Sequence, residues 1–329
     1  MEYRILGRTG VSVSRLCFGT MSFGDTADEA TSAEMFKRCM DAGINFYDCA
    51  NVYAGGRSEE ILGDLIQGIR DELVITTKVC SQMGDGRNNR GMSRRHIMQQ
   101  IEASLRRLQT DRVDVYFIHK FDPLTPIEEA VRALDDLVAQ GKILYPAVSN
   151  WAAWQIMKAL GIAEAEKLAR FECMQPMYNM VKRQAEVELL PLAKGENVGV
   201  IPYSPLGGGL LTGKYSTTNR PDAGRIVENN MYSKRYSEAR YYEIAEAFTE
   251  YAEKEGEHPV TLAVAWVMAH PAVTAPIIGA RNLEQLEPSL KAANIKMSPQ
   301  WRAEISALTD TPPPAHDRLE EQIDGNMTV

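Results

Sequence analysis

The sequence predicts an α/β protein, a (β/α)8 TIM barrel with an N-terminal β-hairpin and long loops at the C-terminal face. Two observations support this fold. Short apolar runs alternate with helical patterns in roughly eight β-then-α units, which is the count of such a barrel, whose usual size is about 250 residues. The chain has 329 residues, and the surplus falls in the hairpin, two long loops and a C-terminal tail.

The elements follow in chain order. Residues 3–13 indicate a hairpin turned by Gly7 to Gly10. Strands are expected near 15–19, 44–48, 73–79, 113–118, 143–148, 172–176, 198–203 and 273–278. Helices are expected near 30–42, 58–68, 94–108, 127–140, 151–168, 184–196, 237–254 and 282–293, with an extra helix over 261–270. The helix over 94–108 shows the signals most clearly, with Ser93 as N-cap and Ile97 and Ile101 at helical spacing.

The loops 80–92 and 207–236 are the long connections of this barrel. We expect residues 1–311 to form a single barrel domain and residues 312–329 to form a proline-led, acidic tail. A flexible end packed loosely on the surface is the simpler interpretation of this tail. A segment that reaches over the barrel mouth is the alternative.

A doubly wound parallel sheet is the rival fold, but the sequence lacks its nucleotide fingerprint. No G-x-G-x-x-G motif occurs at a strand-to-helix turn, and Gly84-Asp-Gly86 lacks a third glycine at the right distance. The segment from Gly208 to Lys214 is close to a phosphate-binding loop. Tyr215 stands where that loop needs Ser or Thr to hold magnesium, so we reject this interpretation.

Composition excludes several functional classes. A net charge of −8 and a pI near 5.3 give no basic footprint for nucleic acid. No run approaches the roughly 18 apolar residues that span a bilayer, and the N-terminus lacks the apolar core of a signal peptide. The five cysteines have no C-x-x-C spacing and are expected to be buried free thiols. A cytoplasmic protein with no membrane or nucleic-acid partner is therefore expected. Assembly into a homo-oligomer is left open.

Four titratable residues lie where predicted strands end: Asp48, Tyr53, Lys78 and His119. A buried strand carries such residues only when they have partners, and the carboxyl ends of barrel strands form the active-site rim. Each residue alone has a structural explanation, such as a loop cap for Asp48 or a satisfied core histidine for His119. Together they can hand a proton to a developing alkoxide, so the chain is expected to be an enzyme that acts on a carbonyl compound.

The motifs at this rim resemble the aldo-keto reductase superfamily. They are Asn45-Phe-Tyr-Asp48-x4-Tyr53, Lys78, Asp114-Val-Tyr-Phe-Ile-His119, Val148-Ser-Asn150, Gln175-Pro, Ile201-Pro-Tyr203-Ser-Pro-Leu and Ile277-Ile-Gly-Ala-Arg281-x3-Gln285-Leu. The resemblance covers residues 3–310. The loop after Lys78 and the segment 207–215 are most similar to a bacterial branch related to potassium-channel β subunits.

The resemblance implies an NADPH-dependent reductase that transfers a hydride to an aldehyde or ketone. Tyr53 would be the general acid. A free tyrosine has a pKa of about 10, and a lysine cation nearby lowers it; Lys78 would do this while Asp48 keeps Lys78 charged and in place. His119 would orient the carbonyl and help relay the proton.

The resemblance also implies the residues that hold NADPH or NADP. They are Gly19, Thr20, Met21, Ser149, Asn150, Gln175, Tyr203, Ser204, Pro205, Leu206, Gly208, Lys214, Gly279, Arg281 and Gln285. Ser149, Asn150 and Gln175 are similar to residues that grip the carboxamide, and Tyr203 to the ring that stacks on the nicotinamide. Arg281, at a helix N-terminus, would bind the 2′-phosphate. Pro288-Ser289 replaces a Glu-Asn pair that usually holds the adenine, so looser NADPH binding is expected.

The substrate is expected to be a small carbonyl compound, sugar-derived or otherwise. The walls of the substrate pocket would come from Phe23, Tyr53, His119, Lys120 and Trp151, together with Ala54, Met231, Tyr232 and Arg235. Lys120 and Arg235 are two cations that would favour a polyhydroxylated or anionic carbonyl compound.

Three other functions were weighed against a reductase. A metal hydrolase needs clustered ligands, and the five histidines form no His-x-His pair, so no metal is expected. A Schiff-base aldolase would use Lys78 as a nucleophile. The third alternative is a channel-β-like regulatory protein that binds NADPH and turns over slowly.

Overall fold

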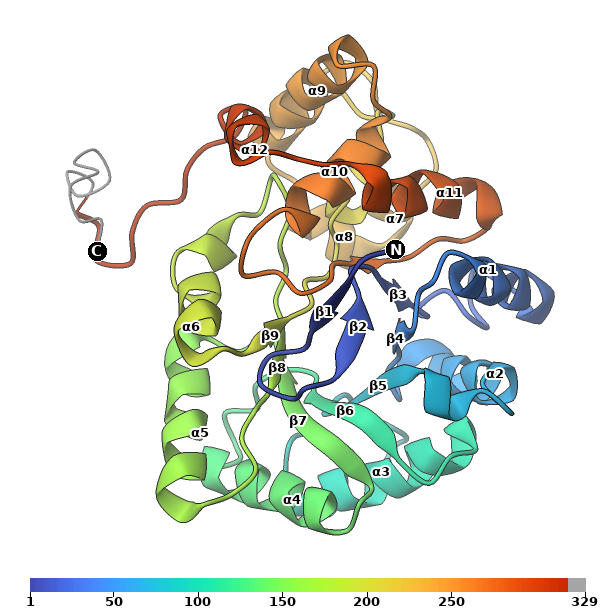
Figure 1. Ribbon diagram of the computed structural model, residues 1–329, viewed down its shortest axis with the longest axis vertical. Helices are drawn as coiled ribbons and strands as arrows, with labels where there is room; N and C mark the ends of the chain where they lie inside the picture. Colours follow the sequence, from blue (N-terminus) through green and yellow to red (C-terminus); the bar gives the residue numbers. More distant parts are fainter. Residues whose placement is uncertain (319–329) are drawn as a thin grey trace.

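The computed structural model describes residues 1–318, and its sheet confirms the (β/α)8 barrel (Figure 1). Eight parallel strands run in the order β10-β3-β4-β5-β6-β7-β8-β9. Their bounds are β3 (Cys17–Gly19), β4 (Phe46–Asp48), β5 (Val74–Val79), β6 (Val113–Ile118), β7 (Ile143–Ser149), β8 (Cys173–Gln175), β9 (Gly199–Val200) and β10 (Ile277–Ile278). The backbone N–H groups of Thr274 and Ile277 donate to the carbonyls of Val200 and Pro202 over 2.9 Å each. These bonds join the last two strands and close the ring.

Helices surround the strands, mostly at the predicted positions. They are α1 (Glu29–Asp41), α2 (Arg57–Leu65), α3 (Arg94–Leu108), α4 (Ile127–Ala139), α5 (Ala153–Glu166), α6 (Leu189–Glu196), α9 (Ala239–Lys254), α10 (Pro259–Met268), α11 (Leu283–Lys291) and α12 (Pro299–Ser306). Two short helices, α7 (Arg225–Glu228) and α8 (Asn230–Arg235), lie in the loop after β9. Sequence reasoning placed no helix there because four to six residues are too few to show a helical period.

Two apolar layers hold the barrel together. One lies between strands and helices; α4 contributes Ile127, Val131 and Leu134, at the three- and four-residue spacing of one helix face. The other fills the barrel interior, where Leu6 and Val13 of the N-terminal hairpin pack against the strand side chains. That hairpin, β1 (Tyr3–Ile5) with β2 (Ser12–Ser14), is antiparallel as predicted and lies in front of the strands in Figure 1. It closes the N-terminal end, so only the carboxyl ends of the strands remain open for chemistry.

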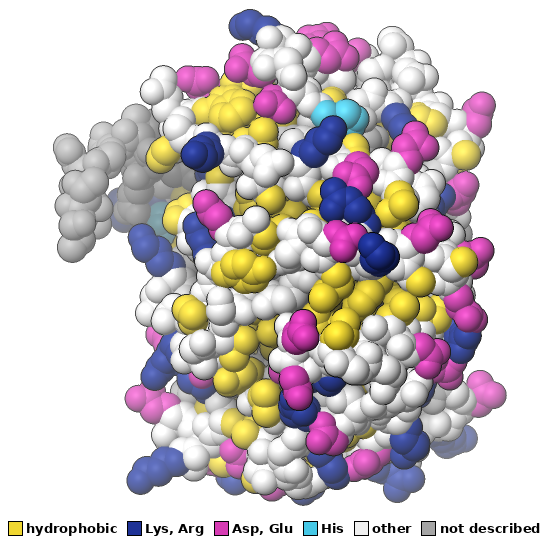
Figure 2. Space-filling model, turned by 45° about the vertical axis from the view of Figure 1, so that its right-hand side comes forward, with side chains coloured by type: hydrophobic (Ala, Val, Ile, Leu, Met, Phe, Trp, Pro, Cys, Tyr) yellow, Lys and Arg dark blue, Asp and Glu magenta, His cyan; other side chains and the backbone are white. Residues whose placement is uncertain are grey.

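The surface mixes both signs of charge. Figure 2 shows Lys and Arg side chains interspersed with Asp and Glu over the face that it displays. None of the helices in residues 1–318 combines the length and apolarity that a bilayer span requires. All five cysteines are buried and free, which confirms that prediction. Residues 312–318 contain neither helix nor strand, and the rest of the predicted tail lies outside the described residues.

Candidate active site at the carboxyl ends of the strands

The four titratable residues singled out from the sequence meet at one end of the barrel. Asp48 ends β4 and Lys78 lies near the end of β5. His119 follows β6, and Tyr53 opens a short 3-10 turn after β4 (Tyr53–Gly56). The side chains of Asp48 and Lys78 are almost fully buried, whereas Tyr53 and His119 are half-buried. This burial leaves Tyr53 and His119 as the members of the group that a ligand can reach.

The Lys78 ammonium makes three hydrogen bonds, two of them to Asp48 and Tyr53 of this group. Its Nζ donates to Asp48 Oδ2 over 2.6 Å, to the Cys49 carbonyl over 2.6 Å and to Tyr53 Oη over 3.3 Å. An ammonium group has three N–H donors, so all of them are engaged by oxygen acceptors. Burial works against the charge, but Asp48 and Tyr53 outweigh it and raise the pKa of Lys78 above its ordinary value. Lys78 is therefore a fixed cation.

The pKa of Tyr53 corrects one expectation from the sequence. The Lys78 ammonium acts to lower this pKa, as predicted, but burial of the phenol acts more strongly and raises the pKa of Tyr53 to about 12. The net shift is upward because desolvation disfavours the phenolate. Tyr53 therefore keeps its proton throughout the neutral range.

His119 lies beside Tyr53, with ring centroids 6.0 Å apart and the planes nearly perpendicular. Burial first, then the charges of Lys78 and Lys120, lower the pKa of His119 to about 3. Its Nδ1 is buried without a hydrogen-bond partner among residues 1–318. His119 is therefore a neutral imidazole, which can orient a carbonyl group but carries no charge.

The segment that carries Tyr53 is held from both sides. The backbone N–H of Asn51 donates to the Lys78 carbonyl, and Asn51 Nδ2 donates to Gln100 Oε1 over 3.0 Å. On the other side, Ala54 has a left-handed φ of 47°, which turns the chain sharply into α2. Sequence reasoning did not identify Asn51 or Gln100.

Asp48 has a second set of partners that the sequence did not reveal. Its Oδ1 accepts from Thr76 Oγ1 over 2.7 Å and from Gln175 Nε2 over 2.9 Å. Thr76 precedes Lys78 by two residues, and side chains two apart on a strand face the same side. That spacing places Thr76 on the same face as Lys78, but it does not show that Thr76 bonds Asp48.

A row of amide and hydroxyl groups continues from His119 toward β9. Asn150 Nδ2 donates to the His119 carbonyl and to Ser149 Oγ over 2.9 Å each. Tyr203 Oη donates to Asn150 Oδ1 over 2.7 Å, and the Ser149 hydroxyl donates to the Gln175 carbonyl. The structure thus brings the four predicted carboxamide and nicotinamide residues into one network.

A recess of about 210 Å³ lies at this network, and Asn150, Gln175, Tyr203 and Trp151 all line it. Trp151 is nearly buried and packs edge-on against Phe121, with ring centroids 5.2 Å apart. The recess therefore has an apolar wall and an amide edge.

Backbone strain marks the same end of the barrel. Four residues other than glycine have positive φ just after strands β4, β5, β7 and β9: Ala54 (47°), Cys80 (121°), Asn150 (58°) and Ser204 (57°). Such conformations are unfavourable and cluster at functional sites. Three of the other such residues, Gln109, Lys167 and Asn197, are helix C-caps, where a left-handed residue is common.

The segment after β9 contains five more residues of the predicted cofactor-binding set. Ser204, Pro205 and Leu206 lead into a glycine turn, Gly207–Gly209. At Gly208, with a φ of 68°, a Cβ atom would lie 2.7 Å from the Tyr232 ring, so only glycine fits. Lys214, farther along, is exposed.

Other residues of the predicted cofactor-binding set lie at the N-terminus of α11. Arg281 precedes the N-cap Asn282, and its guanidinium pairs with Glu228 of α7, Nη2 to Oε2, over 3.3 Å. Gln285 Oε1 accepts the Arg281 N–H, and Gly279 is exposed nearby. Ser289 is buried, with no partner for its hydroxyl among residues 1–318, so it presents no donor to a ligand outside the helix.

The end of β3 and the loop after it differ from expectation. Gly19 and Thr20 are fully buried, and the Thr20 hydroxyl is bonded to Ser58, so only Met21 of this group is exposed. The prediction that Phe23 contacts substrate is wrong, because its ring is fully buried against Phe18 in the core.

Lys120 and Arg235, the two cations among the predicted wall residues, lie beside residues of the rim, whereas Tyr232 is buried. Lys120 is exposed beside His119. The Arg235 guanidinium carbon lies 6.0 Å from the Tyr203 ring centroid and 5.1 Å from that of Tyr232.

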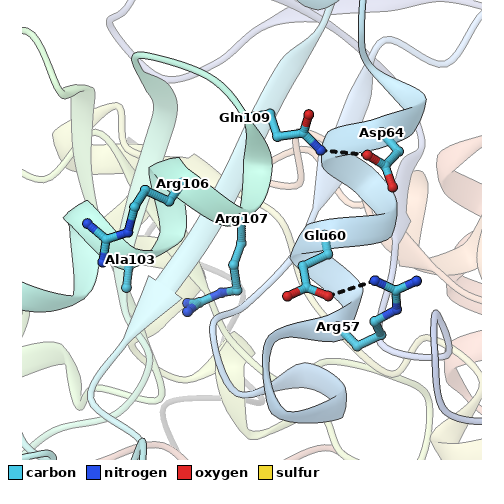
Figure 3. A pocket seen from close by; sticks show the side chains of 7 residues that line it. All are labelled: Arg57, Glu60, Asp64, Ala103, Arg106, Arg107 and Gln109. Carbon is cyan, nitrogen blue, oxygen red and sulfur yellow. Dashed lines mark hydrogen bonds and ion pairs between the residues drawn. The ribbon is translucent and has the colours of Figure 1, made fainter.

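A second recess, of about 430 Å³, lies outside the barrel between α2 and α3. Figure 3 shows Arg57 turned toward Glu60 and Gln109 toward Asp64 within it. None of the four titratable residues lines it. We therefore assign the chemistry to the strand ends and not to this recess. Residues 1–318 contain no group of three or more His, Cys, Asp or Glu side chains placed to hold a metal ion.

Comparison with known proteins identifies the family. The model of the Aldo/keto reductase family matches residues 15–310. The chain belongs to this family. It is 40% identical over 309 residues to a Bacillus subtilis protein described as an uncharacterized oxidoreductase, covering 90% of this chain and 92% of that protein. The predicted resemblance is thus confirmed, and the chain is an aldo/keto reductase-family oxidoreductase.

Two further relatives are described as potassium-channel subunits. A probable voltage-gated potassium channel subunit beta of Arabidopsis thaliana is 37% identical over 303 residues, covering 90% of this chain and 92% of the relative. A putative subunit of the same kind from Schizosaccharomyces pombe is 34% identical over 332 residues, covering 95% and 94%. The predicted likeness to channel β subunits is therefore also confirmed.

Proposed function

We propose that the protein is an NADPH-dependent reductase of aldehydes or ketones in which Tyr53 donates the proton. The observation that carries this proposal is the hydrogen bond from Lys78 to Tyr53 Oη. Because Lys78 has three N–H groups and all are engaged, Tyr53 Oη accepts and its own proton is free for another acceptor. An acid placed in this way can protonate a developing alkoxide.

The electrostatics of the site suit proton donation. With a pKa of about 12, Tyr53 is protonated at neutral pH and is still more acidic than an alcohol. Neutral His119, 6.0 Å away between ring centroids, would orient the substrate oxygen toward Tyr53. In this proposal His119 positions the substrate and Tyr53 transfers the proton.

The residues present fit a nicotinamide dinucleotide. Tyr203 offers a half-buried ring beside the amide groups of Asn150 and Gln175, and all three line the same recess. Arg281 stands before the helix N-terminus of α11, a position that favours a phosphate group. When bound, the cofactor supplies the hydride, and the chain supplies position and electrostatics.

Two other functions, a Schiff-base aldolase and a regulatory NADPH-binding protein, can be distinguished from a reductase. An aldolase would need Lys78 as a free nucleophile, but its ammonium is fully engaged and its pKa is raised, which disfavours this role. A regulatory NADPH-binding protein is supported by the two relatives described as channel subunits. Both subunit-like and metabolic roles are compatible with a cytoplasmic protein.

A screen of NADPH oxidation tests the proposal. The substrates would be sugar aldehydes, keto-sugars, phosphorylated trioses and aromatic aldehydes, with Tyr53→Phe as the matched control. We expect steady turnover by the parent, a loss of about 10² to 10⁴ in rate for Tyr53→Phe, and unchanged NADPH binding. Tight NADPH binding without steady turnover on any substrate class would favour the regulatory protein. Turnover by Tyr53→Phe close to that of the parent would remove Tyr53 from the mechanism.

A further inference from the structure

The Asp48 carboxylate makes more hydrogen bonds than holding Lys78 requires. Oδ2 binds the Lys78 ammonium, and Oδ1 accepts one hydrogen bond from Thr76 and one from Gln175. All four residues are at most 3% exposed. A buried carboxylate with this many donors has little freedom to rotate or shift, because each movement would leave a buried polar group without a partner.

Thr76 is placed by the sheet itself. In the parallel pairing of β4 with β5, Asp48 is the register partner of Thr76, so the two side chains are neighbours on the inner face. The Thr76 hydroxyl donates to Asp48 Oδ1 over 2.7 Å. Thr77, the next residue, faces the other side, where its hydroxyl donates to Glu59 Oε1 over 2.5 Å. The chain thus contains two adjacent buried threonines with similar bonds, of which only one reaches Asp48.

Gln175 reaches Asp48 from the opposite wall. It ends β8, which stands four strands from β4 in the eight-stranded order, so its side chain crosses the barrel interior. Because a carboxylate only accepts, the amide Nε2 must be the donor to Asp48. The amide oxygen of Gln175 takes no part in the bond to Asp48. Gln175 also lines the recess together with Asn150 and Tyr203.

We propose that Thr76, with Gln175, is a positioning residue for the proposed proton donor. Thr76 fixes the Asp48 carboxylate from the neighbouring strand, and Gln175 fixes it from across the barrel. Asp48 in turn holds the Lys78 ammonium against Tyr53. Gln175 also connects this chain of contacts to the recess proposed for the nicotinamide. The expected fall in kcat rests on the proposed function. The expected change in the position of Lys78 rests on the hydrogen bonds alone.

The kinetic test compares Thr76→Val, Thr76→Ser and Thr77→Val. Thr76→Val keeps the shape and removes the hydroxyl, so we expect kcat to fall by roughly tenfold or more, the scale of one hydrogen bond to a charged group. KM for the carbonyl compound and the Kd of NADPH should be unchanged, because Thr76 does not line the recess. Thr76→Ser should restore kcat, and Thr77→Val should keep it although it also removes a buried hydroxyl.

A second measurement needs neither cofactor nor turnover. Acetylation by acetic anhydride requires a neutral amine, and the extent at Lys78 can be read by mass spectrometry of its peptide. We expect Lys78 to be protected in the parent, in Thr76→Ser and in Thr77→Val, and to be acetylated several-fold faster in Thr76→Val. Gln175→Met should also raise Lys78 acetylation and, unlike Thr76→Val, weaken NADPH binding.

The outcomes separate this inference from the proposed function. If no carbonyl compound is reduced by the parent, the proposed function fails, while acetylation still decides whether Thr76 positions Lys78. If Tyr53→Phe is inactive but Thr76→Val matches the parent in kcat and in Lys78 acetylation, only this inference fails. Equal acetylation of Lys78 in Thr76→Val and Thr77→Val would also overturn this inference. Should Thr76→Val not fold, Gln175→Met decides by the same acetylation measurement.

Discussion

The contact from Lys78 Nζ to Tyr53 Oη, at 3.3 Å, is the longest of the three hydrogen bonds that the ammonium makes. The two shorter bonds anchor Lys78 to Asp48 and to the Cys49 carbonyl. The cation is therefore held mainly by the barrel, and Tyr53 is its weakest partner. In the proposed mechanism, the phenol would therefore give up its proton and regain it without disturbing the position of Lys78.

The first prediction concerns pH. Because the pKa of Tyr53 is raised to about 12 and that of His119 is lowered to about 3, neither group changes protonation between pH 5 and pH 9. The chemical step of carbonyl reduction should be level across this range. Alcohol oxidation, which needs the Tyr53 phenolate, should rise about tenfold per pH unit toward the alkaline end. Single-turnover rates in both directions would measure this, and an inflection near pH 6.5 in reduction would show that His119 ionises.

The second prediction concerns the buried ion pair. Lys78→Met leaves the Asp48 carboxylate without its cation in a site that is almost fully buried. Removing one partner of a buried pair costs about 3 to 5 kcal/mol of stability, so Tm should fall sharply and turnover should be lost. Adding Asp48→Asn removes the unpaired charge and should recover much of Tm but none of the turnover. If the double variant regained turnover, Lys78 would be a structural residue only.

The third prediction concerns cofactor preference. Arg281 pairs with Glu228, and both side chains are substantially exposed, so the pair itself contributes at most about 1 kcal/mol. A 2′-phosphate should displace Glu228 readily. Arg281→Ala should remove most of the preference for NADPH over NADH, and Glu228→Gln should strengthen NADPH binding. Fluorescence titration with both dinucleotides measures each Kd.

Retained NADPH preference in Arg281→Ala would show that the 2′-phosphate binds elsewhere. Since Ser289 is buried and Pro288 has no N–H, the adenine side offers little replacement. Arg281 should therefore carry a large share of the affinity.

The fourth prediction concerns the substrate. The Arg235 guanidinium lies near the Tyr203 and Tyr232 rings, and no carboxylate pairs with it among residues 1–318. An anionic carbonyl compound should gain from this charge. We expect succinic semialdehyde to be a better substrate than butyraldehyde, and Arg235→Met to lower kcat/KM for the former only. Equal kcat/KM for this matched pair in the parent would argue against an anionic substrate.

Particular residues show how far the sequence leads. Asp48, Lys78 and His119 are predictable because a polar residue at the end of an apolar strand must reach the barrel rim. Thr76 escapes notice because threonine is common in strands and its hydroxyl suggests no partner. Its bond to Asp48 depends on the register of β4 and β5, which only the folded sheet supplies.

The pKa of Tyr53 and the place of Phe23 were mispredicted for a related reason. A nearby cation can be inferred from the motif, but the extent of burial that opposes it is a property of the whole barrel. Phe23 follows a barrel strand and looks like a loop residue, yet its ring turns back onto Phe18. In both cases, burial decides the outcome, and burial depends on segments far away in the sequence.

The hairpin that closes the barrel floor has a practical consequence for handling the protein. Met1 and the strand Tyr3–Ile5 are exposed, whereas Leu6 and Val13 are fully buried. An affinity tag joined ahead of Met1 should be tolerated because it extends from the surface. Cutting the chain after Val13 would remove Leu6 and Val13 and expose apolar side chains of the same interior cluster, including Cys17 and Phe46, to water. Truncated or fused forms of the protein should therefore keep the first fourteen residues intact, even though these residues lie at the end opposite the candidate active site.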